Sequence, residues 1–359
     1  MTVVQLLLLI SLVIPAWAQE KNWNETVAAG RKEGKVVVTS SPDPVMRKEI
    51  IPKFTAKFGI PVEFLAGRAA DLVGKVRAER VAGIYSIDVF MVGITQAAKI
   101  LYPEKFLDPL KSMLILPEVT DASKWKKGKP WFVDPEEQYI LRPFQHVAEL
   151  LFINTDYVKR DEMRSAKDLV NPKWRGKIAT DDPTASSGSG ASIADHFYLL
   201  LGEEFVKRLY IEQKPMRSRD KRQLTDWLAR GTYPICISCS SDDVTELRNE
   251  AFKIAEIFEL SDVPGRLSAS PWSLAVANQT PQPNAARVFA NWIISKEALE
   301  IYSRAHRATT LRNDVDESFL PRETIPRPGV NYRDEEWSWM AGGRDETRKQ
   351  VIKVLKQSY

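Results

Sequence analysis

The chain has few of the residues that metal centres and disulfide frameworks need. Its 359 residues include two cysteines and three histidines. The histidines are His146, His196 and His306, and none of them is spaced to share a zinc ion with the cysteine pair. We therefore expect no zinc site.

Familiar catalytic motifs are also absent from the sequence. It contains no G-x-S-x-G, no H-E-x-x-H and no G-x-x-x-x-G-K pattern. Three histidines are few for acid–base chemistry, and none stands beside an obvious nucleophile. These gaps predict a protein that is not an enzyme and that uses no cofactor.

No strong excess of one charge is present. The 51 basic and 47 acidic residues give a formal charge of +4, and hydrophobic residues make up 44% of the chain. This balance is typical of a soluble globular protein and argues against nucleic-acid binding, which needs clustered basic residues. The length suits two lobes better than one core.

Only the first 18 residues form a long apolar run. The run ends in Ala16-Trp17-Ala18, the small-x-small pattern that a signal peptidase cleaves. It is too short to cross a bilayer as a helix. We predict export with cleavage near Ala18-Gln19, although no Lys or Arg precedes the run.

The cysteines stand three apart, as Cys236-Ile237-Ser238-Cys239. The residues before them are typical of a strand, and Ser240 and the residues after it are typical of a helix start. In an oxidising compartment two such thiols tend to pair. We expect a local disulfide or two packed thiols, with a thiol–disulfide oxidoreductase as the alternative.

Strand and helix patterns alternate along most of the chain. Strands are predicted at 35–38, 62–65 and 87–92, with helices at 46–58 and 69–82 between them. The alternation resumes with apolar runs at 146–154, 177–180, 235–238 and 273–277. This order predicts open, mostly parallel sheets flanked by helices, with ligands bound beyond the carboxyl ends of the strands.

One loop at such an edge has the composition of an anion site. The stretch from Asp181 to Gly190 runs from a strand into a helix and carries four hydroxyls. The first amides of a helix attract negative charge, so a phosphate or carboxylate fits there. A plain Ser/Gly loop with a helix N-cap is the alternative. The candidate ligands in this loop are Thr184, Ser186, Ser187, Gly188 and Ser189.

Further candidates follow the other strands. Ser40 and Ser41 end the first strand, where capping of the next helix is the alternative. Arg68 follows the second strand and is able to fork two hydrogen bonds onto an anion. Tyr233 and Ser238 are predicted to lie at the matching edge of the second sheet.

Several segments, in their order and spacing, resemble one known family. They are "AAGRKEGKVVVTSS", "FTAKFGIPVEFLAGRAADLVGKVRAERVAGIYSIDVF", "LLFINTDYV", "AKDLVNPKWRGKIATDDP" and "QPNAARVFANWIISKEALEIY". The chain resembles, over roughly 23–315, the periplasmic solute-binding proteins of ABC importers, in the group related to ferric-iron binders. The resemblance implies a type 2 fold, a monomer, a periplasmic location and a membrane permease as partner.

The resemblance also implies a division of the chain into two lobes joined by a hinge. The expected parts are a signal peptide (1–18), the first part of lobe 1 (19–147), lobe 2 (148–261), the return to lobe 1 with its packing helices (262–320) and a C-terminal helical tail (321–359).

The sequence departs from the iron branch of this family at the ligands. The resemblance implies tyrosine oxygens at the corner from Ile237 to Ser241, where this chain has Ile-Ser-Cys-Ser-Ser. An arginine beside a bare cation would also repel it. We therefore predict a small anion of carboxylate, phosphate or phosphonate type, clasped by Arg68 and the 184–189 loop from opposite lobes. Ferric iron or another metal is the alternative.

Overall fold

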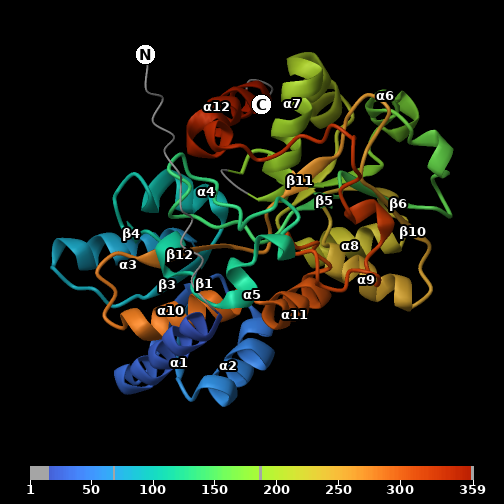
Figure 1. The fold of residues 1–359 in the computed structure, drawn as a ribbon. Coiled ribbons are helices and arrows are strands. Elements are labelled where there is room, and N and C mark those ends of the chain that lie inside the picture. The colour runs from blue at the N-terminus through green and yellow to red at the C-terminus, as the bar shows by residue number, and fades with distance from the viewer. Residues whose placement is uncertain (1–15, 68, 186–187, 357–359) are drawn as a thin grey trace, which may run out of the picture.

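A computed structural model describes residues 16–67, 69–185 and 188–356. Among these residues, two five-stranded sheets are connected by a two-stranded ladder, with helices packed on the sheets (Figure 1). This two-lobe α/β architecture confirms the predicted fold class. No described helix is long and apolar enough to cross a membrane.

Lobe 1 is built on the first sheet. Its strand order is β2 (Val62–Ala66), β1 (Val36–Ser40), β3 (Val89–Val92), β12 (Ser273–Ala277) and β4 (Leu107–Asp108). Strand side chains alternate between two faces. Val36, Val38 and Met91 therefore share a core with α1 (Ala16–Glu33), α2 (Ile51–Phe58), α10 (Pro283–Ile293) and α11 (Lys296–His306). Phe90 and Val92 face α3 (Ala69–Val81) and the π-helical turn η2 (Ala97–Leu101).

Lobe 2 is built on the second sheet. Its strand order is β10 (Ile254–Ile257), β6 (Leu151–Asn154), β9 (Ile235–Ile237), β7 (Ile178–Asp181) and β8 (Met216–Ser218). One face packs against α7 (Ser189–Lys207) and α12 (Arg344–Lys356), and the other against α8 (Lys221–Ala229) and α9 (Ser241–Asn249). A short helix, α6 (Ala166–Leu169), covers its rim.

Among the described strands, each five-stranded sheet has two parallel and two antiparallel pairings. The parallel share is therefore smaller than the sequence predicts. The reason is that β12 and β6 lie where the chain enters a sheet from the hinge, and each runs opposite to the other strands of its sheet.

The predicted strand over 146–154 is two strands. β5 (His146–Ala148) pairs with β11 (Arg266–Ser268) in the ladder between the lobes, whereas β6 pairs with β10 and β9. The chain passes from lobe 1 to lobe 2 at β5 and returns at β11. We call these two strands the hinge; they lie at the centre of Figure 1.

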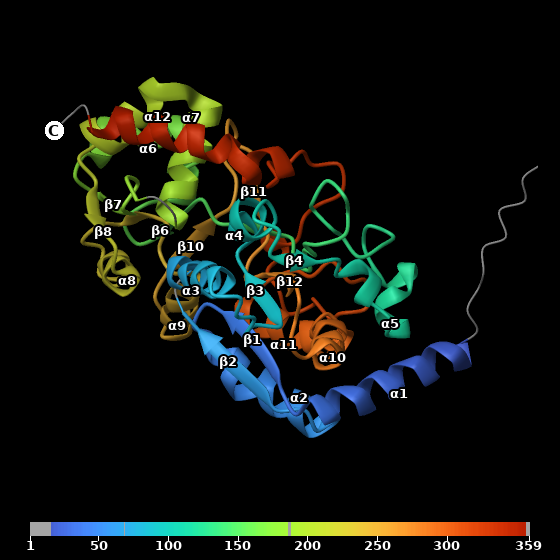
Figure 2. The same cartoon turned by 90° about the vertical axis from the view of Figure 1, so that its left-hand side faces the viewer.

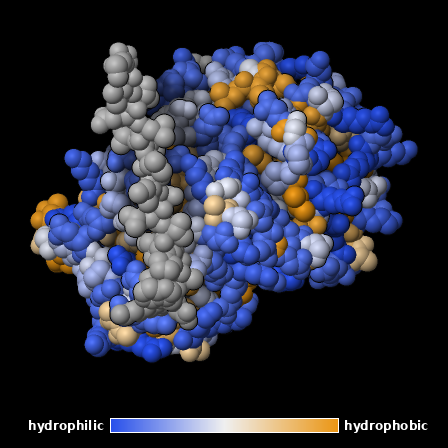
Figure 3. Space-filling model, in the orientation of Figure 1, coloured by the Kyte–Doolittle hydropathy of each residue, from blue (hydrophilic) through white to orange (hydrophobic). Residues whose placement is uncertain are grey.

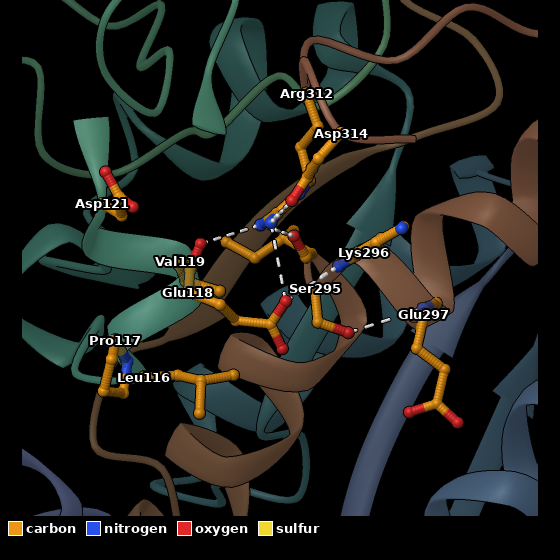
Figure 4. Close-up of polar contacts among 12 residues, drawn as sticks. Leu116, Pro117, Glu118, Val119, Asp121, Ser295, Lys296, Glu297, Arg312 and Asp314 are labelled. Carbon is orange, nitrogen blue, oxygen red and sulfur yellow. Dashed lines mark hydrogen bonds and ion pairs between the residues drawn. The ribbon is translucent and has the colours of Figure 1, made fainter. Parts of the chain in front are cut away.

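Lobe 1 also contains a fully buried arginine, Arg312 (Figure 4). Its guanidinium donates to both carboxylate oxygens of Asp314 at 2.8 and 2.9 Å and to the carbonyl of Glu118 at 3.1 Å, in α5 (Pro117–Thr120). A buried charge is tolerated when it is paired and hydrogen-bonded. Arg312 meets both conditions and ties α5 to the segment that follows α11.

The face seen in Figure 3 is mostly hydrophilic, and one of its hydrophobic areas lies over α7. That helix carries the exposed Leu199 and Leu200.

The helix α7 also carries His196, which is fully buried and whose Nε2 lies 3.0 Å from the carbonyl oxygen of Pro264, next to the hinge. Burial lowers the pKa of His196 to about 3.

The low pKa of His196 predicts acid sensitivity. The unfolded chain takes up a proton near pH 6.5, while folded His196 stays neutral until about pH 3, so its contribution to stability is lost as the pH falls between these values. We expect the free energy of unfolding to drop by about 2 kcal/mol from this residue alone between pH 7 and pH 5. Urea unfolding at both pH values measures it. His196→Gln should show a smaller drop, and an equal drop would contradict the assignment.

Candidate functional site

A pocket of about 350 Å³ lies between the two lobes beside the hinge. Lobe 1 contributes Gly93 to Gln96, where β3 leads into α4 (Ile94–Gln96), and lobe 2 contributes the first turn of α7. Arg266 and the segment Ser268–Trp272 come from the returning chain, and Glu335 and Arg344 come from the C-terminal tail. The site is therefore assembled from four distant parts of the sequence.

Arg266 is the unusual residue of this pocket. It is 9% exposed, and its buried Nε has no hydrogen-bond partner. No ion pair joins its guanidinium to a described carboxylate, although Glu335 and Glu149 act on it electrostatically and raise its pKa. A buried cation without a partner is costly, so this arrangement favours a negatively charged guest.

The other buried arginines of the described chain are all paired. Arg142 lies 2.7 Å from Asp334, Arg312 lies 2.8 Å from Asp314, and Arg348 lies 3.0 Å from Asp195. Three of the four arginines that are buried as whole residues therefore have a carboxylate partner. Arg266 is the described exception, and it faces a pocket.

The charges near Arg266 make this end of the pocket basic. Burial lowers the pKa of Arg266, the carboxylates of Glu335 and Glu149 raise it, and Arg344 lowers it by repulsion. Burial also lowers the pKa of Arg333, and repulsion from the Arg266 charge lowers it further. Three guanidinium groups therefore compete for few carboxylates, and a bound anion would stabilise their charged forms.

The first turn of α7 reaches the pocket, as the sequence predicts for Gly188 and Ser189. However, Asp181 at the end of β7 already accepts hydrogen bonds there, from Gly190 N at 3.1 Å and from Ser189 Oγ at 3.3 Å. Gly190 is required, because a Cβ atom would stand 2.7 Å from the Asp181 carbonyl oxygen. The protein's own Asp181 carboxylate thus already occupies part of the positive N-terminal end of α7.

Lys221 completes this internal network at the edge of lobe 2. Its ammonium lies 2.8 Å from Asp181, donates to Ser189 Oγ at 2.6 Å and donates to the Ser238 carbonyl oxygen. Burial lowers the pKa of Lys221, and its bond to Asp181 raises it. The charge of Lys221 is therefore compensated, unlike that of Arg266.

Cys236 and Cys239 form a disulfide, which answers whether the two thiols pair. It joins the middle of β9 to the turn before α9, and Ser238 in this turn has a left-handed backbone, φ +67°. Ser238 is 3% exposed, and its Oγ has no hydrogen-bond partner. The corner predicted between strand and helix is present, and Ser238 lies at the same sheet edge as Asp181.

Five of the described predicted ligands do not line the pocket: Ser40, Ser41, Thr184, Tyr233 and Ser238. Thr184 donates from its hydroxyl to Asp182 at 2.6 Å and lines a separate cavity with Arg219. Ser40 is buried and Ser41 exposed at the end of β1, and neither lines the described pocket. Arg68, Ser186 and Ser187 lie outside the described residues.

The predicted position of Tyr233 is wrong. It precedes β9, whereas Ser238 follows this strand, so the two residues lie at opposite ends. Its ring packs against Trp227, with centroids 5.3 Å apart. The error arises because Tyr233 stands before β9 and Ser238 after it, so the strand separates the two residues along its length.

Sequence reasoning missed Arg266, Arg344 and Glu335. Arg266 stands in the polar stretch "GRLSAS", which does not suggest a buried strand, and the other two lie in a tail rich in charge. No local pattern in the sequence distinguishes these three residues from ordinary surface charges.

A larger pocket of about 740 Å³ lies elsewhere, between Phe258 and the tail around Arg327 and Tyr332. There Arg327 is already bonded to Glu259 at 2.6 and 2.7 Å. We regard the smaller pocket as the candidate site because it holds the uncompensated charge. The described residues contain no group of three His, Cys, Asp or Glu side chains suited to a metal ion.

Removing the Arg266 charge should cost the empty protein little. We expect Arg266→Met to leave the free energy of unfolding unchanged or higher, because it deletes a buried charge that has no partner. The matched variant Arg312→Met leaves Asp314 and two carbonyls unpaired, so it should lose roughly 3 kcal/mol. Urea denaturation of both variants without added anion tests this, and equal losses would argue against an uncompensated charge.

Comparisons with known proteins agree with this architecture. The profile of the bacterial extracellular solute-binding protein family matches residues 39–300. Iron uptake protein A1 of Synechocystis sp. is 26% identical over 133 residues, 36% of this chain and 32% of that relative. The match to this relative thus spans about a third of its length.

Two solved structures show the same fold. One is Trichodesmium IdiA (FutA) in complex with iron and citrate, with a TM-score of 0.64 and 17% identity over 90% of this chain and 99% of that chain. The other is AfuA from Actinobacillus pleuropneumoniae with fructose-6-phosphate bound, with a TM-score of 0.63 and 16% identity over 90% and 98%. At these identities the likeness concerns the fold. The family profile matches most of this chain's length, so the chain belongs to the bacterial extracellular solute-binding protein family.

Proposed function

We propose that this protein is the exported substrate-binding component of an ABC importer and that it captures a small anion in the interlobe pocket. The family supports the role of a solute carrier rather than an enzyme. The unpaired Arg266 carries the choice of an anion, because a buried guanidinium gains most from a charged oxygen partner.

The energy available from this contact fits a specific site. A hydrogen bond to a charged group contributes about 1.5–3 kcal/mol, and more than one such bond forms when a guanidinium grips an oxyanion. Hydroxyls of Ser268, Ser270 and Thr95 line the same pocket and provide further donors. Lobe closure would exclude water and strengthen these contacts.

Iron is the second candidate, and the names of the relatives favour it over the free anion. Fe(III) is a hard cation that prefers anionic oxygen ligands. The described pocket offers one carboxylate, Glu335, beside two arginines, so a bare ferric ion would be poorly held. IdiA binds iron with citrate. Iron would fit this pocket as a chelate whose polycarboxylate supplies the metal ligands and meets Arg266.

A thiol–disulfide oxidoreductase has less support. Cys236 is fully buried and Cys239 is 7% exposed in their disulfide. A redox centre of that kind needs an accessible, reactive sulfur. The corner instead braces the edge of lobe 2 that carries Ser238. A membrane permease remains the proposed partner that receives the solute.

A thermal-shift screen with phosphate, citrate and ferric citrate tests the proposal. A ligand at 100 times its Kd adds about 2.7 kcal/mol, which is a measurable rise in Tm. We expect at least one of these probes to raise Tm, and Arg266→Met to weaken its binding by roughly 10- to 100-fold.

The three probes separate the two candidates. Stabilisation by citrate or phosphate supports a free anion, and stabilisation by ferric citrate alone, with iron retained after dialysis, supports the chelate. Equal affinity of Arg266→Met and wild type for the active probe would contradict the proposed site.

A further inference from the structure

The C-terminal segment from Arg333 to Lys356, which we call the strap, contacts the hinge, lobe 1 and lobe 2 in turn. At its start Arg333 N donates to Gly265 O at 3.1 Å, and Leu267 N donates to Arg333 O at 2.8 Å. Arg333 thus extends the hinge ladder directly beside Arg266. Asp334 then accepts a hydrogen bond from Arg142 at 2.7 Å.

The strap next enters the core of lobe 1. Met340, in the π-helical turn η9 (Trp339–Gly343), is fully buried in the cluster that contains Phe90 and Ala98. Lys99 of η2 forms an ion pair with Asp345, at the start of α12. These contacts hold the middle of the strap to lobe 1.

The strap ends in the core of lobe 2. Val351 and Leu355 of α12 are fully buried in the cluster that contains Phe197 of α7. Figure 2 shows α12 lying along α7. Because its middle is buried in lobe 1 and its end in lobe 2, the strap is a third link between the lobes, in addition to β5 and β11.

Arg344 connects this link to the pocket. Its Nη2 donates to Ser192 Oγ in α7 at 2.8 Å, its Nε lies 3.6 Å from Asp195, and it lines the pocket that holds Arg266. Its neighbour Asp345 is the residue paired with Lys99 in lobe 1. The adjacent residues Arg344 and Asp345 therefore connect the pocket, lobe 2 and lobe 1.

A buried anchor fixes Arg344 in this position. Asp195 is fully buried 3.0 Å from Arg348, which also donates to the carbonyl oxygens of Ala191 and Pro183, both at 2.7 Å. These bonds hold the first turns of α12 against α7. Gly342 and Gly343 precede Arg344, and consecutive glycines let the backbone bend between the two anchored halves.

We infer that Arg344 is a solute-binding residue and that the strap couples solute binding to the relative position of the lobes. The inference rests on the proposed function and narrows it. Guanidinium groups from the hinge and from the strap face one pocket, so they suit an anion with charged oxygens on two sides, such as a phosphate group or a polycarboxylate. Such an anion bridges Arg266 and Arg344 and so tightens the strap.

Isothermal titration calorimetry with phosphate and with citrate tests the inference. Arg344→Gln should weaken binding of the active probe about 10-fold or more, and Arg344→Lys should recover part of the loss because it keeps the charge but not the fork. Asp345→Asn and Lys99→Met, which lie outside the pocket, should each weaken binding about 3- to 10-fold, and the double variant should lose no more than either. Glu203→Gln removes a comparable exposed ion pair within α7 and should bind like wild type.

The outcomes separate the strap from the proposed function. If Asp345→Asn and Lys99→Met bind the probe with wild-type affinity, the proposed coupling through the strap is wrong, even if Arg266→Met still abolishes binding. A wild-type protein that binds neither phosphate nor citrate would overturn the narrowed ligand class, and binding of ferric citrate by that protein would leave the interlobe solute site standing.

Discussion

The cost of burying a positive charge governs the whole interpretation of this protein. Arg142, Arg312 and Arg348 are buried, and each has a carboxylate within 3.0 Å. Arg266 is buried without one among the described residues. Because a fold of marginal stability tolerates few uncompensated charges, the exception indicates a role outside folding. A negatively charged solute would supply the missing partner.

The fold places the Arg266 charge in the pocket between the lobes, where a bound solute would contact it. Arg266 stands on the hinge strand β11, between sheets that belong to different lobes. The pocket around it also receives the first turn of α7 and the strap residue Arg344. In the proposed function, movement of one lobe against the other would change the surroundings of Arg266 and so couple solute binding to lobe closure.

Local sequence patterns predicted much of the scaffold. The β-branched run that begins at Val36, the apolar stripe of α10 and the glycine after Phe58 specify their elements through periodicity and backbone preference. Patterns failed where long-range packing decides, as in the split of 146–154 between the hinge and lobe 2. They also failed for the site, because the burial of Arg266 depends on residues far apart in the chain and because hydrophobic periodicity does not reveal that Asp181 occupies the α7 end. The prediction for Arg68 lies outside the described residues.

The most direct test of the uncompensated charge is a crystal structure of the protein soaked in selenate, an oxyanion with an anomalous signal. The account predicts an anomalous peak in the interlobe pocket, within hydrogen-bonding distance of the Arg266 guanidinium and facing Arg344. An empty pocket with selenate bound only at other surfaces, or a protein side chain found paired with Arg266, would contradict it.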